Sequence, residues 1–406
     1  MSLLPVQDAL NQILASVGAG TGIETIAIYN AFGRTLATDL HAQRTQPPAD
    51  MSAMDGYAVH IADLETLPAT LKLLGQSAAG NGFKGEIYPK TCVRIFTGAP
   101  VPQGADTVII QENTIVNGAD ITVLTAPEKG KNIRKAGIDF NHGDVLLQSG
   151  TRLGATQLAL AASMNHATLT VRKRPRIGIL ATGDELVEAG TELRPNQIIS
   201  SNNFSIAALA LDAGAEIFDL GIAPDNLQKL IETIQKAQQL NLDVIVTLGG
   251  ASVGDHDLVQ EALKIPGCTP DFWRIAMRPG KPMMFGSLGK MRVLGLPGNP
   301  VASHLCGLIF LQPLLRALVG DPNAGQDKSQ PARLGCDIAA NDKRQDYIRC
   351  SAVFSSTALP VITPFVIQDS SMLSTLAKAD ALLIREPFAD VGKAGDLCRI
   401  IKLNSA

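Results

Sequence analysis

The chain has 406 residues and a formal net charge of −3, and 46% of its residues are hydrophobic whereas 18% are charged. This composition favours well-packed globular domains over disorder, and a prior of about 150 residues per domain suggests two to four of them. The small net charge and the lack of any Lys/Arg block exclude an obvious nucleic-acid-binding face.

The N-terminus and the cysteines predict a cytoplasmic enzyme. The opening residues MSLLPVQDALNQ lack a basic region followed by an apolar core, so we expect no signal peptide and no membrane anchor. The apolar stretch 301–319 is interrupted by His304, Gln312, Pro313 and Arg316, which favours a buried helix over a membrane span. The six cysteines form no C-x-x-C pair, so we expect reduced thiols and, for any metal, oxygen ligands.

The first half of the chain changes character twice. Residues 5–17 place apolar side chains on one face of a helix, namely Val6, Ala9, Leu10, Ile13, Leu14 and Val17. From about residue 40 to 150, short apolar runs separated by turn pairs such as Asn81-Gly82 and Asn117-Gly118 predict a β-rich module. Residues 154–164 (GATQLALAASM) are again typical of a helix.

From residue 176 onward, strand and helix patterns alternate. Strands are predicted at 176–183, 216–224, 243–250 and 291–298, and helices at 204–214, 226–240 and 300–319. This alternation predicts a doubly wound, mainly parallel α/β sheet. A Gly/Pro-rich linker at 320–335 then leads to a small β domain.

Ligands of such sheets bind beyond the carboxyl ends of the strands, at a topological switch point. The loops that follow the predicted strands carry five acidic residues, Asp184, Glu185, Asp225, Asp255 and Asp257. Clustered carboxylates repel one another unless a cation intervenes. We therefore expect a site at this edge of the sheet.

Cations follow in the segment DFWRIAMRPGKP (271–282). The strand period places Arg274 and Arg278 on one face, and the Pro279-Gly280 turn presents Lys281 beside Arg278. Cations next to carboxylates suit a ligand that bears an oxyanion and is held partly through Mg²⁺.

The segment GASVG (250–254) fits the G-x-S-x-G pattern, which raises the alternative of a serine hydrolase with Ser252 as nucleophile. A hydrolase triad needs a downstream histidine, but His256 lies in the same loop and His304 lies in an apolar helix without an apparent acid partner. We interpret Gly250, Ser252 and Gly254 as a backbone cradle for phosphate or a pterin ring.

Six motifs together resemble the molybdopterin molybdenumtransferase family, which includes MoeA and the gephyrin E domain. They are SAMDGYAV (52–59), RIFTGAPVPQGADTVI (94–109), TGDEL (182–186), GGASVGDHD (249–257), RPGKP (278–282) and LPGNPV (296–301). The resemblance implies a multidomain α/β fold with a helical N-terminal domain (1–45 plus 140–172), an inserted β-rich module (46–139), an α/β molybdopterin-binding domain (173–322) and a C-terminal β-barrel (323–406). It also implies an elongated homodimer whose sites are shared between subunits.

The activity implied by this resemblance is Mg²⁺-dependent insertion of molybdate into adenylylated molybdopterin, with release of AMP and no covalent enzyme intermediate. An adenylyltransferase would supply the substrate. The sequence does not distinguish molybdate from tungstate.

The resemblance also implies roles for individual residues. The residues expected to organise Mg²⁺ and the phosphates are Asp184, Glu185, Asp225 and Asp257. Those expected to hold phosphate or molybdate are Arg274, Arg278 and Lys281, while Pro297 and Pro300 shape the binding loop. Those expected to reach the site of the partner subunit are Asp55, Thr97, Arg134 and Asp139. Arg349 and Ser370 are expected to close the C-terminal domain over molybdate.

The chain departs from the family at Arg274 and Arg278, where lysine is common. Arginine keeps the charge but presents a planar fork, so the affinity for anions could differ. Besides the hydrolase, two alternatives stay open: a stand-alone adenylyltransferase or molybdopterin-binding module, and a non-catalytic scaffold.

Overall fold

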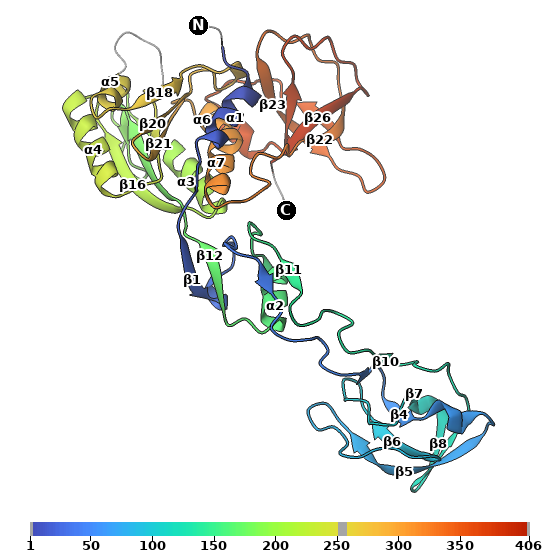
Figure 1. The fold of residues 1–406 in the computed structure, drawn as a ribbon. Coiled ribbons are helices and arrows are strands. Elements are labelled where there is room, and N and C mark those ends of the chain that lie inside the picture. The colour runs from blue at the N-terminus through green and yellow to red at the C-terminus, as the bar shows by residue number, and fades with distance from the viewer. Residues whose placement is uncertain (1–2, 251–257, 404–406) are drawn as a thin grey trace.

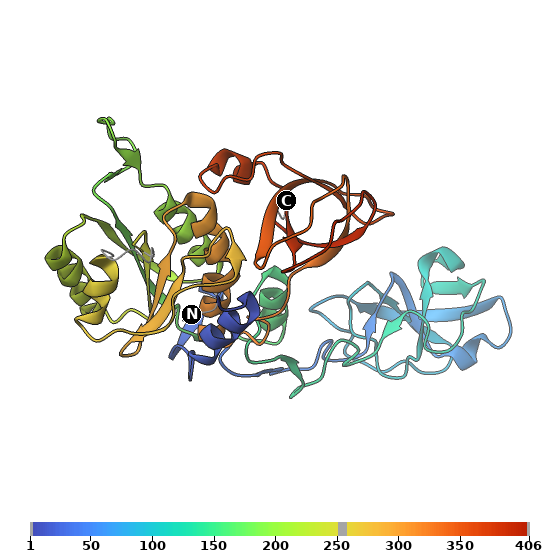
Figure 2. The ribbon, with the colours of Figure 1, turned by 90° about the horizontal axis from the view of Figure 1, so that it is seen from above.

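The computed structural model describes residues 3–250 and 258–403. The chain is elongated, with the inserted module at one end, a small domain in the middle, and the α/β and C-terminal domains side by side at the other end (Figures 1 and 2).

The α/β domain is built on a sheet of order β16-β13-β17-β21-β20-β18. Its first four strands run parallel to one another, and β20 and β18 extend the sheet through antiparallel pairs. The predicted doubly wound, mainly parallel sheet is therefore confirmed. The elements are β13 (Arg176–Thr182), β14 (Leu186–Val187), β15 (Ile198–Ile199), α3 (Asn202–Asp212), β16 (Glu216–Ala223), α4 (Leu227–Gln239), β17 (Val244–Leu248), α5 (Leu258–Lys264), β18 (Thr269–Phe272), β20 (Met284–Leu288), β21 (Met291–Leu296), α6 (Pro300–Cys306), the π-helical turn η4 (Gly307–Leu311) and α7 (Gln312–Leu318).

Strand β13 lies between β16 and β17 in the sheet. The chain continues from β13 to its neighbour β16 and then crosses to β17, the neighbour on the other side of β13. This reversal makes the carboxyl ends of β13 and β17 the switch point. Every residue of β17 is buried, as is nearly all of β13, which explains their uninterrupted apolar sequences.

The apolar stretch at Pro300–Leu318 forms a core helix, as predicted. By length and composition alone this helical stretch could cross a membrane, but 72% of it is buried inside the protein. Pro313 has no N–H to bond to the carbonyl of residue 309, and the helix widens into the π turn η4 just before it.

The predicted helical N-terminal domain (1–45 plus 140–172) is wrong, because this region is mostly strands. The pairs β1–β12 and β2–β11 are antiparallel and enclose a core that includes Leu36, Phe140 and Leu153. The elements are β1 (Ile23–Ala27), η1 (Ile28–Asn30), β2 (Leu40–His41), β11 (Val145–Leu147), α2 (Ala155–Ser163) and β12 (Thr168–Arg172).

The amphipathic helix expected at 5–17 exists as α1 (Val6–Ala15), but it belongs to the α/β domain. Val6, Ala9 and Ile13 are buried in the same core as residues of α7. A short amphipathic helix gains most of its stability from tertiary packing, so the large apolar surface of the α/β domain determines where it lies.

The inserted module is β-rich, as predicted. Its sheet has the order β7-β4-β6-β5-β9-β8, and Gly118, directly after the last residue of β8, lies in the turn between β8 and β9. The elements are β3 (Met51–Ser52), β4 (Gly56–Val59), η2 (Ile61–Leu64), β5 (Ala69–Ser77), β6 (Thr91–Ile95), β7 (Thr107–Ile110), η3 (Gln111–Asn113), β8 (Thr114–Asn117), β9 (Asp120–Val123) and β10 (Ile133–Arg134).

The C-terminal domain is a closed barrel of five strands, which confirms the predicted barrel. The strands follow one another in the order β23-β24-β22-β26-β25, and β25 pairs again with β23. The elements are β22 (Gln330–Leu334), β23 (Gln345–Val353), β24 (Val361–Pro364), α8 (Leu373–Ala377), β25 (Ala381–Arg385) and β26 (Leu397–Lys402). Strand β19 (Met277–Arg278), which precedes β20 in the chain, pairs in parallel with β23 and joins the two domains.

Candidate functional site

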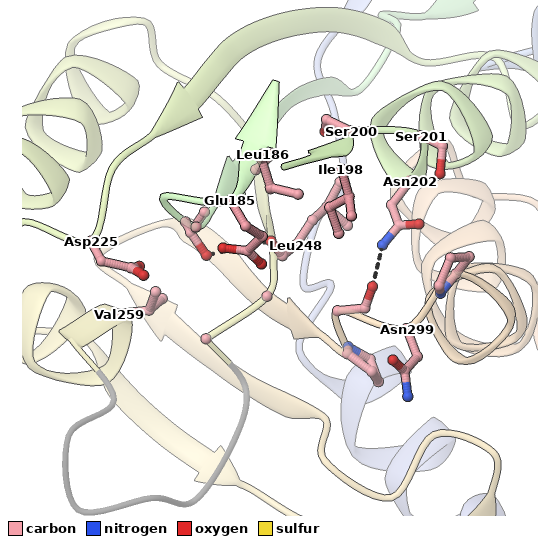
Figure 3. Close-up of a pocket in the computed structure, with 18 of the residues that line it drawn as sticks. Glu185, Leu186, Ile198, Ser200, Ser201, Asn202, Asp225, Leu248, Val259 and Asn299 are labelled. Carbon is pink, nitrogen blue, oxygen red and sulfur yellow. Dashed lines mark hydrogen bonds between the residues drawn. The ribbon is translucent and has the colours of Figure 1, made fainter. Parts of the chain in front are cut away.

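A cavity of about 900 Å³ lies at the carboxyl ends of β13, β17 and β21 (Figure 3). It is lined by residues 181–183, 185–186, 198–202, 248–250 and 297–300, together with Asp225, Leu258, Val259, Pro282 and Ser371. The cavity thus lies at the edge of the sheet that the switch-point rule selects.

Glycines allow the loops to converge at the cavity. Gly249 has a φ of +99°, and a Cβ at this position would lie 2.9 Å from the carbonyl oxygen of Thr182. Gly183 has a φ of +145°, and a Cβ there would collide with the carboxylate of Glu185. A side chain at Gly249 would thus push apart the two strand ends that define the switch point, whereas one at Gly183 would displace the carboxylate of Glu185.

Three of the five acidic residues predicted for this edge lie there, and Asp255 is outside the described residues. Glu185 and Asp225 line the cavity, and a carboxylate oxygen of Asp184 accepts a hydrogen bond of 3.0 Å from the backbone N–H of Asp225. The N-cap of α4 is Asn226, which accepts from the N–H of Lys229, so Asp225 is not needed for capping. Asp257 lies outside the described residues.

These carboxylates do not form a complete protein cage for a metal. Within the described ranges, no group of three or more His, Cys, Asp or Glu side chains could hold a metal ion. Mg²⁺ typically uses one or two protein carboxylates and completes its shell with substrate phosphates and water. The pair Glu185 and Asp225 fits that manner of binding.

The N-terminus of α3 also faces the cavity, a feature that our sequence reasoning missed. Ser200, Ser201 and Asn202 line the wall, and Asn202 donates a hydrogen bond of 2.7 Å from Nδ2 to the carbonyl of Gly298. The N-cap Ser201 makes no side-chain capping bond, so N–H groups of the first turn stay available to an anion. The Ser-Ser-Asn-Asn sequence before an apolar helix was the signal that could have revealed this.

The three predicted cations do not line the cavity in the part of the chain that the structure describes. Arg278 instead makes ion pairs with Asp342 and Asp346 of the C-terminal domain. Lys281 is exposed beside the cavity-lining Pro282, and Arg274 is half-buried. Their role in holding an anion stays a prediction.

The loop that contains Pro297 and Pro300 joins the cavity to the C-terminal domain. Asn299 donates a hydrogen bond of 2.8 Å from Nδ2 to Oγ of Ser370, and the N–H of Val301 donates to the carbonyl of Ser370 over 3.0 Å. The next residue, Ser371, lines the cavity. The C-terminal domain thus contributes to the lining of the cavity.

Arg349 lies behind this contact and is only 1% exposed. Its guanidinium donates to Oε1 of Gln368 (3.2 Å) and to the carbonyls of Asp369 (3.0 Å) and Met372 (3.1 Å). Burial lowers the pKa of this guanidinium, and the carboxylate of Asp369 partly opposes the shift. Arg349 therefore holds the segment that carries Ser370 and Ser371.

The residues predicted in the inserted module lie far from this cavity within the same chain (Figures 1 and 2). Asp55 accepts hydrogen bonds from the N–H (2.7 Å) and Oγ1 (2.8 Å) of Thr97, and these bonds lower the pKa of its carboxyl. Arg134 on β10 and Asp139 after it are exposed. The structure brings Asp55 and Thr97 together but does not bring either to the cavity of its own chain.

Two further predicted residues, Ser252 and Gly254, lie outside the described residues, whereas Gly250 lines the cavity. Both the cradle and the nucleophile interpretation of Ser252 stay predictions.

Family models define the class to which this arrangement belongs. Residues 4–165 match the MoeA N-terminal region (domain I and II), residues 178–317 a probable molybdopterin-binding domain, and residues 331–403 the MoeA C-terminal region (domain IV). A molybdopterin molybdenumtransferase from Haemophilus influenzae is 34% identical over 403 residues, or 99% of each chain. One from Bacillus subtilis is 31% identical, covering 94% of this chain and 90% of the relative. The crystal structure of a molybdopterin biosynthesis MoeA protein from Pyrococcus horikoshii OT3 has a TM-score of 0.85 and 25% identity, covering 99% of this chain and 100% of its own.

The chain therefore belongs to the molybdopterin molybdenumtransferase family, and it is a transferase of molybdenum cofactor biosynthesis.

Proposed function

We propose that this chain transfers molybdenum from molybdate to molybdopterin that arrives in adenylylated form, and that AMP is released. An adenylyltransferase acting earlier would provide that substrate. The observation that carries the proposal is the single cavity in which an uncapped helix N-terminus, two carboxylates and a serine from the C-terminal domain converge.

The helix N-terminus suits the phosphates of the substrate. Backbone N–H groups at the start of α3 would donate to phosphate oxygens, and the positive end of the helix dipole favours the negative charge. Asn202, fixed by its bond to Gly298, would keep this donor group at a constant distance from the 297–300 loop.

The carboxylates of Glu185 and Asp225 would hold Mg²⁺ against the same phosphates. When bound, this ion supplies positive charge that offsets the charge developing on the phosphate oxygens as the anhydride is cleaved. Asp184 would keep the turn at residue 225 in place through its bond to the backbone N–H.

Molybdate would bind where Ser371 faces the cavity and Ser370 contacts the 297–300 loop. Arg349 would hold these serines in place from behind. Lys281 is exposed next to Pro282, and its positive charge would attract the molybdate dianion.

We further propose that the chain works as a homodimer in which the inserted module of one subunit reaches the cavity of the other. The separation between the inserted module and the α/β domain of the same chain supports this, because the module could act at a cavity of the α/β domain only from a second subunit (Figures 1 and 2). Large apolar side chains are also left exposed on the central and α/β domains, namely Tyr29, Phe32, Phe204 and Leu211.

Turnover tests the proposal directly. Purified chain is supplied with adenylylated molybdopterin, molybdate and Mg²⁺, and AMP and active cofactor are measured. We expect both products to form, and to be lost after chelation and in Glu185→Gln. Glu188→Gln changes a nearby exposed carboxylate that does not line the cavity and should keep full activity. ATP-dependent adenylylation of molybdopterin, without molybdenum insertion, would instead support the stand-alone adenylyltransferase.

Mixing two inactive variants tests the shared site. Asp55→Asn and Glu185→Gln subunits, combined and allowed to exchange, should regain roughly a quarter of wild-type activity, because half of the dimers are mixed and each has one intact site. No recovery, with exchange verified by mass spectrometry, would mean that both residues serve one subunit.

A further inference from the structure

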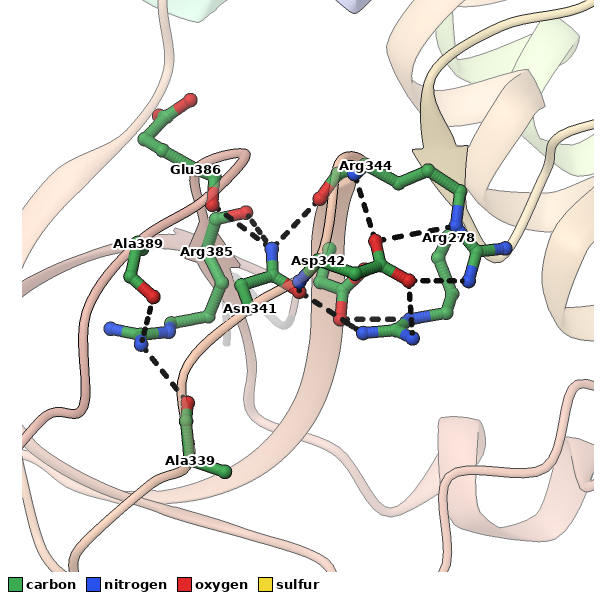
Figure 4. Close-up of polar contacts among 9 residues, drawn as sticks. Arg278, Ala339, Asn341, Asp342, Arg344, Arg385, Glu386 and Ala389 are labelled. Carbon is green, nitrogen blue, oxygen red and sulfur yellow. Dashed lines mark hydrogen bonds and ion pairs between the residues drawn. The ribbon is translucent and has the colours of Figure 1, made fainter.

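Arg278 forms a polar contact between the α/β and C-terminal domains (Figure 4). Its Nε donates a hydrogen bond of 2.8 Å to Oδ2 of Asp346, and Nη2 donates to the same oxygen. Nη1 pairs with Asp342 at 3.3 Å, and Nη2 donates to Oδ1 of Asn341 over 3.0 Å. One cation of the α/β domain thus bonds three side chains of the C-terminal domain.

Asp346 is the buried member of this cluster. It is 5% exposed, and Oδ1 has no hydrogen-bond partner. Asp342, by contrast, is exposed and is also held by Arg344 over 2.9 Å. A buried carboxylate is strongly destabilising without its cation, so the ion pair with Arg278 restricts where β23 can lie.

The backbone fixes the same position. Strand β19 pairs with β23 so that Arg278 lies opposite Asp346, and the N–H of Gln345 donates to the carbonyl of Ala276 over 2.8 Å. Side-chain and backbone contacts therefore specify one register between the two domains.

The same strand leads to the cavity. Three residues after Asp346, β23 carries Arg349, which holds the segment from Gln368 to Met372. That segment presents Ser370 to Asn299 and Ser371 to the cavity. A shift of β23 would displace these serines.

We propose that Asp346 is a positioning residue for the reaction: anchored by Arg278, it sets the register of β23 and so holds Ser370 and Ser371 at the cavity. Arg278 acts in this way as an anchor between domains. The inference rests on the proposed function for its kinetic consequence, but the geometry of the segment can be measured without turnover.

The test compares Asp346→Asn with Asp337→Asn. Asp337 forms an exposed ion pair of 2.8 Å with Lys393 within the same domain, so its loss controls for removal of a barrel carboxylate. We expect Asp346→Asn to raise the KM for molybdate about 10- to 100-fold with a smaller change in kcat, since small displacements of binding groups have effects of this size. Asp337→Asn should leave both constants unchanged.

Two further readouts keep the result interpretable. Amide hydrogen exchange of residues 368–372 should accelerate in Asp346→Asn and not in Asp337→Asn, while exchange in β17 reports that the α/β domain is folded. Arg278→Gln should act non-additively with Asp346→Asn, so the double variant should be no worse than the more impaired single variant.

Unchanged exchange and KM in Asp346→Asn would overturn the inference. A normal Asp346→Asn together with an inactive Arg278→Gln would also overturn it, and would show that Arg278 binds the anion directly. Failure of the wild-type chain to release AMP would reject the proposed function alone, because the exchange of residues 368–372 would still decide the role of Asp346.

Discussion

Replacing Gly249 with alanine should damage the switch point itself. The backbone φ of +99° is unfavourable for any L-residue and costs about 1 to 3 kcal/mol. In addition, the new Cβ would lie 2.9 Å from the carbonyl oxygen of Thr182 and 3.0 Å from its Oγ1. Displacing packed groups to relieve such a contact costs about a further 1 to 3 kcal/mol. We expect the free energy of unfolding of the α/β domain to fall by roughly 2 to 6 kcal/mol in total.

Gly267 offers a matched control in the same domain. Its φ is +97°, but a Cβ there would have no atom within 4 Å. Gly267→Ala should therefore lower the free energy of unfolding only through its unfavourable backbone conformation. The single tryptophan, Trp273, packs against the α/β core, so its fluorescence during urea denaturation follows this domain. Molybdopterin binding, measured by calorimetry, should be lost only in Gly249→Ala. Equal destabilisation and equal binding in the two variants would refute this reasoning.

Three other predictions follow from single side chains. Asp225→Asn, which leaves the Glu185 carboxylate in place, should raise the Mg²⁺ concentration needed for half-maximal AMP release by about tenfold for one lost charge-assisted contact; an unchanged titration would place the ion elsewhere. His304 is hydrogen-bonded to Ser205 over 2.7 Å, and burial lowers its pKa in the folded protein. As the pH falls below about 6.5, this histidine therefore takes up a proton in the unfolded chain before it does so in the folded protein, and the free energy of unfolding should decrease. In His304→Gln the urea midpoint should lose this pH dependence, and a persisting slope would assign it to another group. Burial raises the pKa of Cys306 to about 12, so iodoacetamide at pH 8 should label the partly exposed Cys336 and spare Cys306 in native protein, as read by mass spectrometry; rapid labelling of Cys306 would contradict its burial.

The α/β domain and its binding edge could be predicted because their determinants are local. Buried strands such as β13 and β17 can be recognised by their uninterrupted apolar sequence, and the acidic residues directly follow the ends of strands. The location of Asp184, Glu185 and Asp225 at this edge of the sheet could therefore be predicted without the tertiary structure.

The features that were not predicted depend on contacts between residues that are distant in sequence. The periodicity of residues 5–17 correctly gave a helix but not its packing partner, which lies about 300 residues further along the chain on α7. The ion pairs of Arg278 with Asp342 and Asp346 were not predicted, because these two residues lie more than sixty positions further along the chain. The N-terminus of α3 was missed because Ser and Asn before a helix are usually read as caps.

A crystal structure of this chain with molybdopterin bound would test the central claim most directly. We predict that the phosphate of the ligand lies at the N-terminus of α3, with the rest of the molecule in the cavity between residues 182–185 and 297–300. Density for molybdopterin at any other surface, with this cavity filled only by water, would contradict the account.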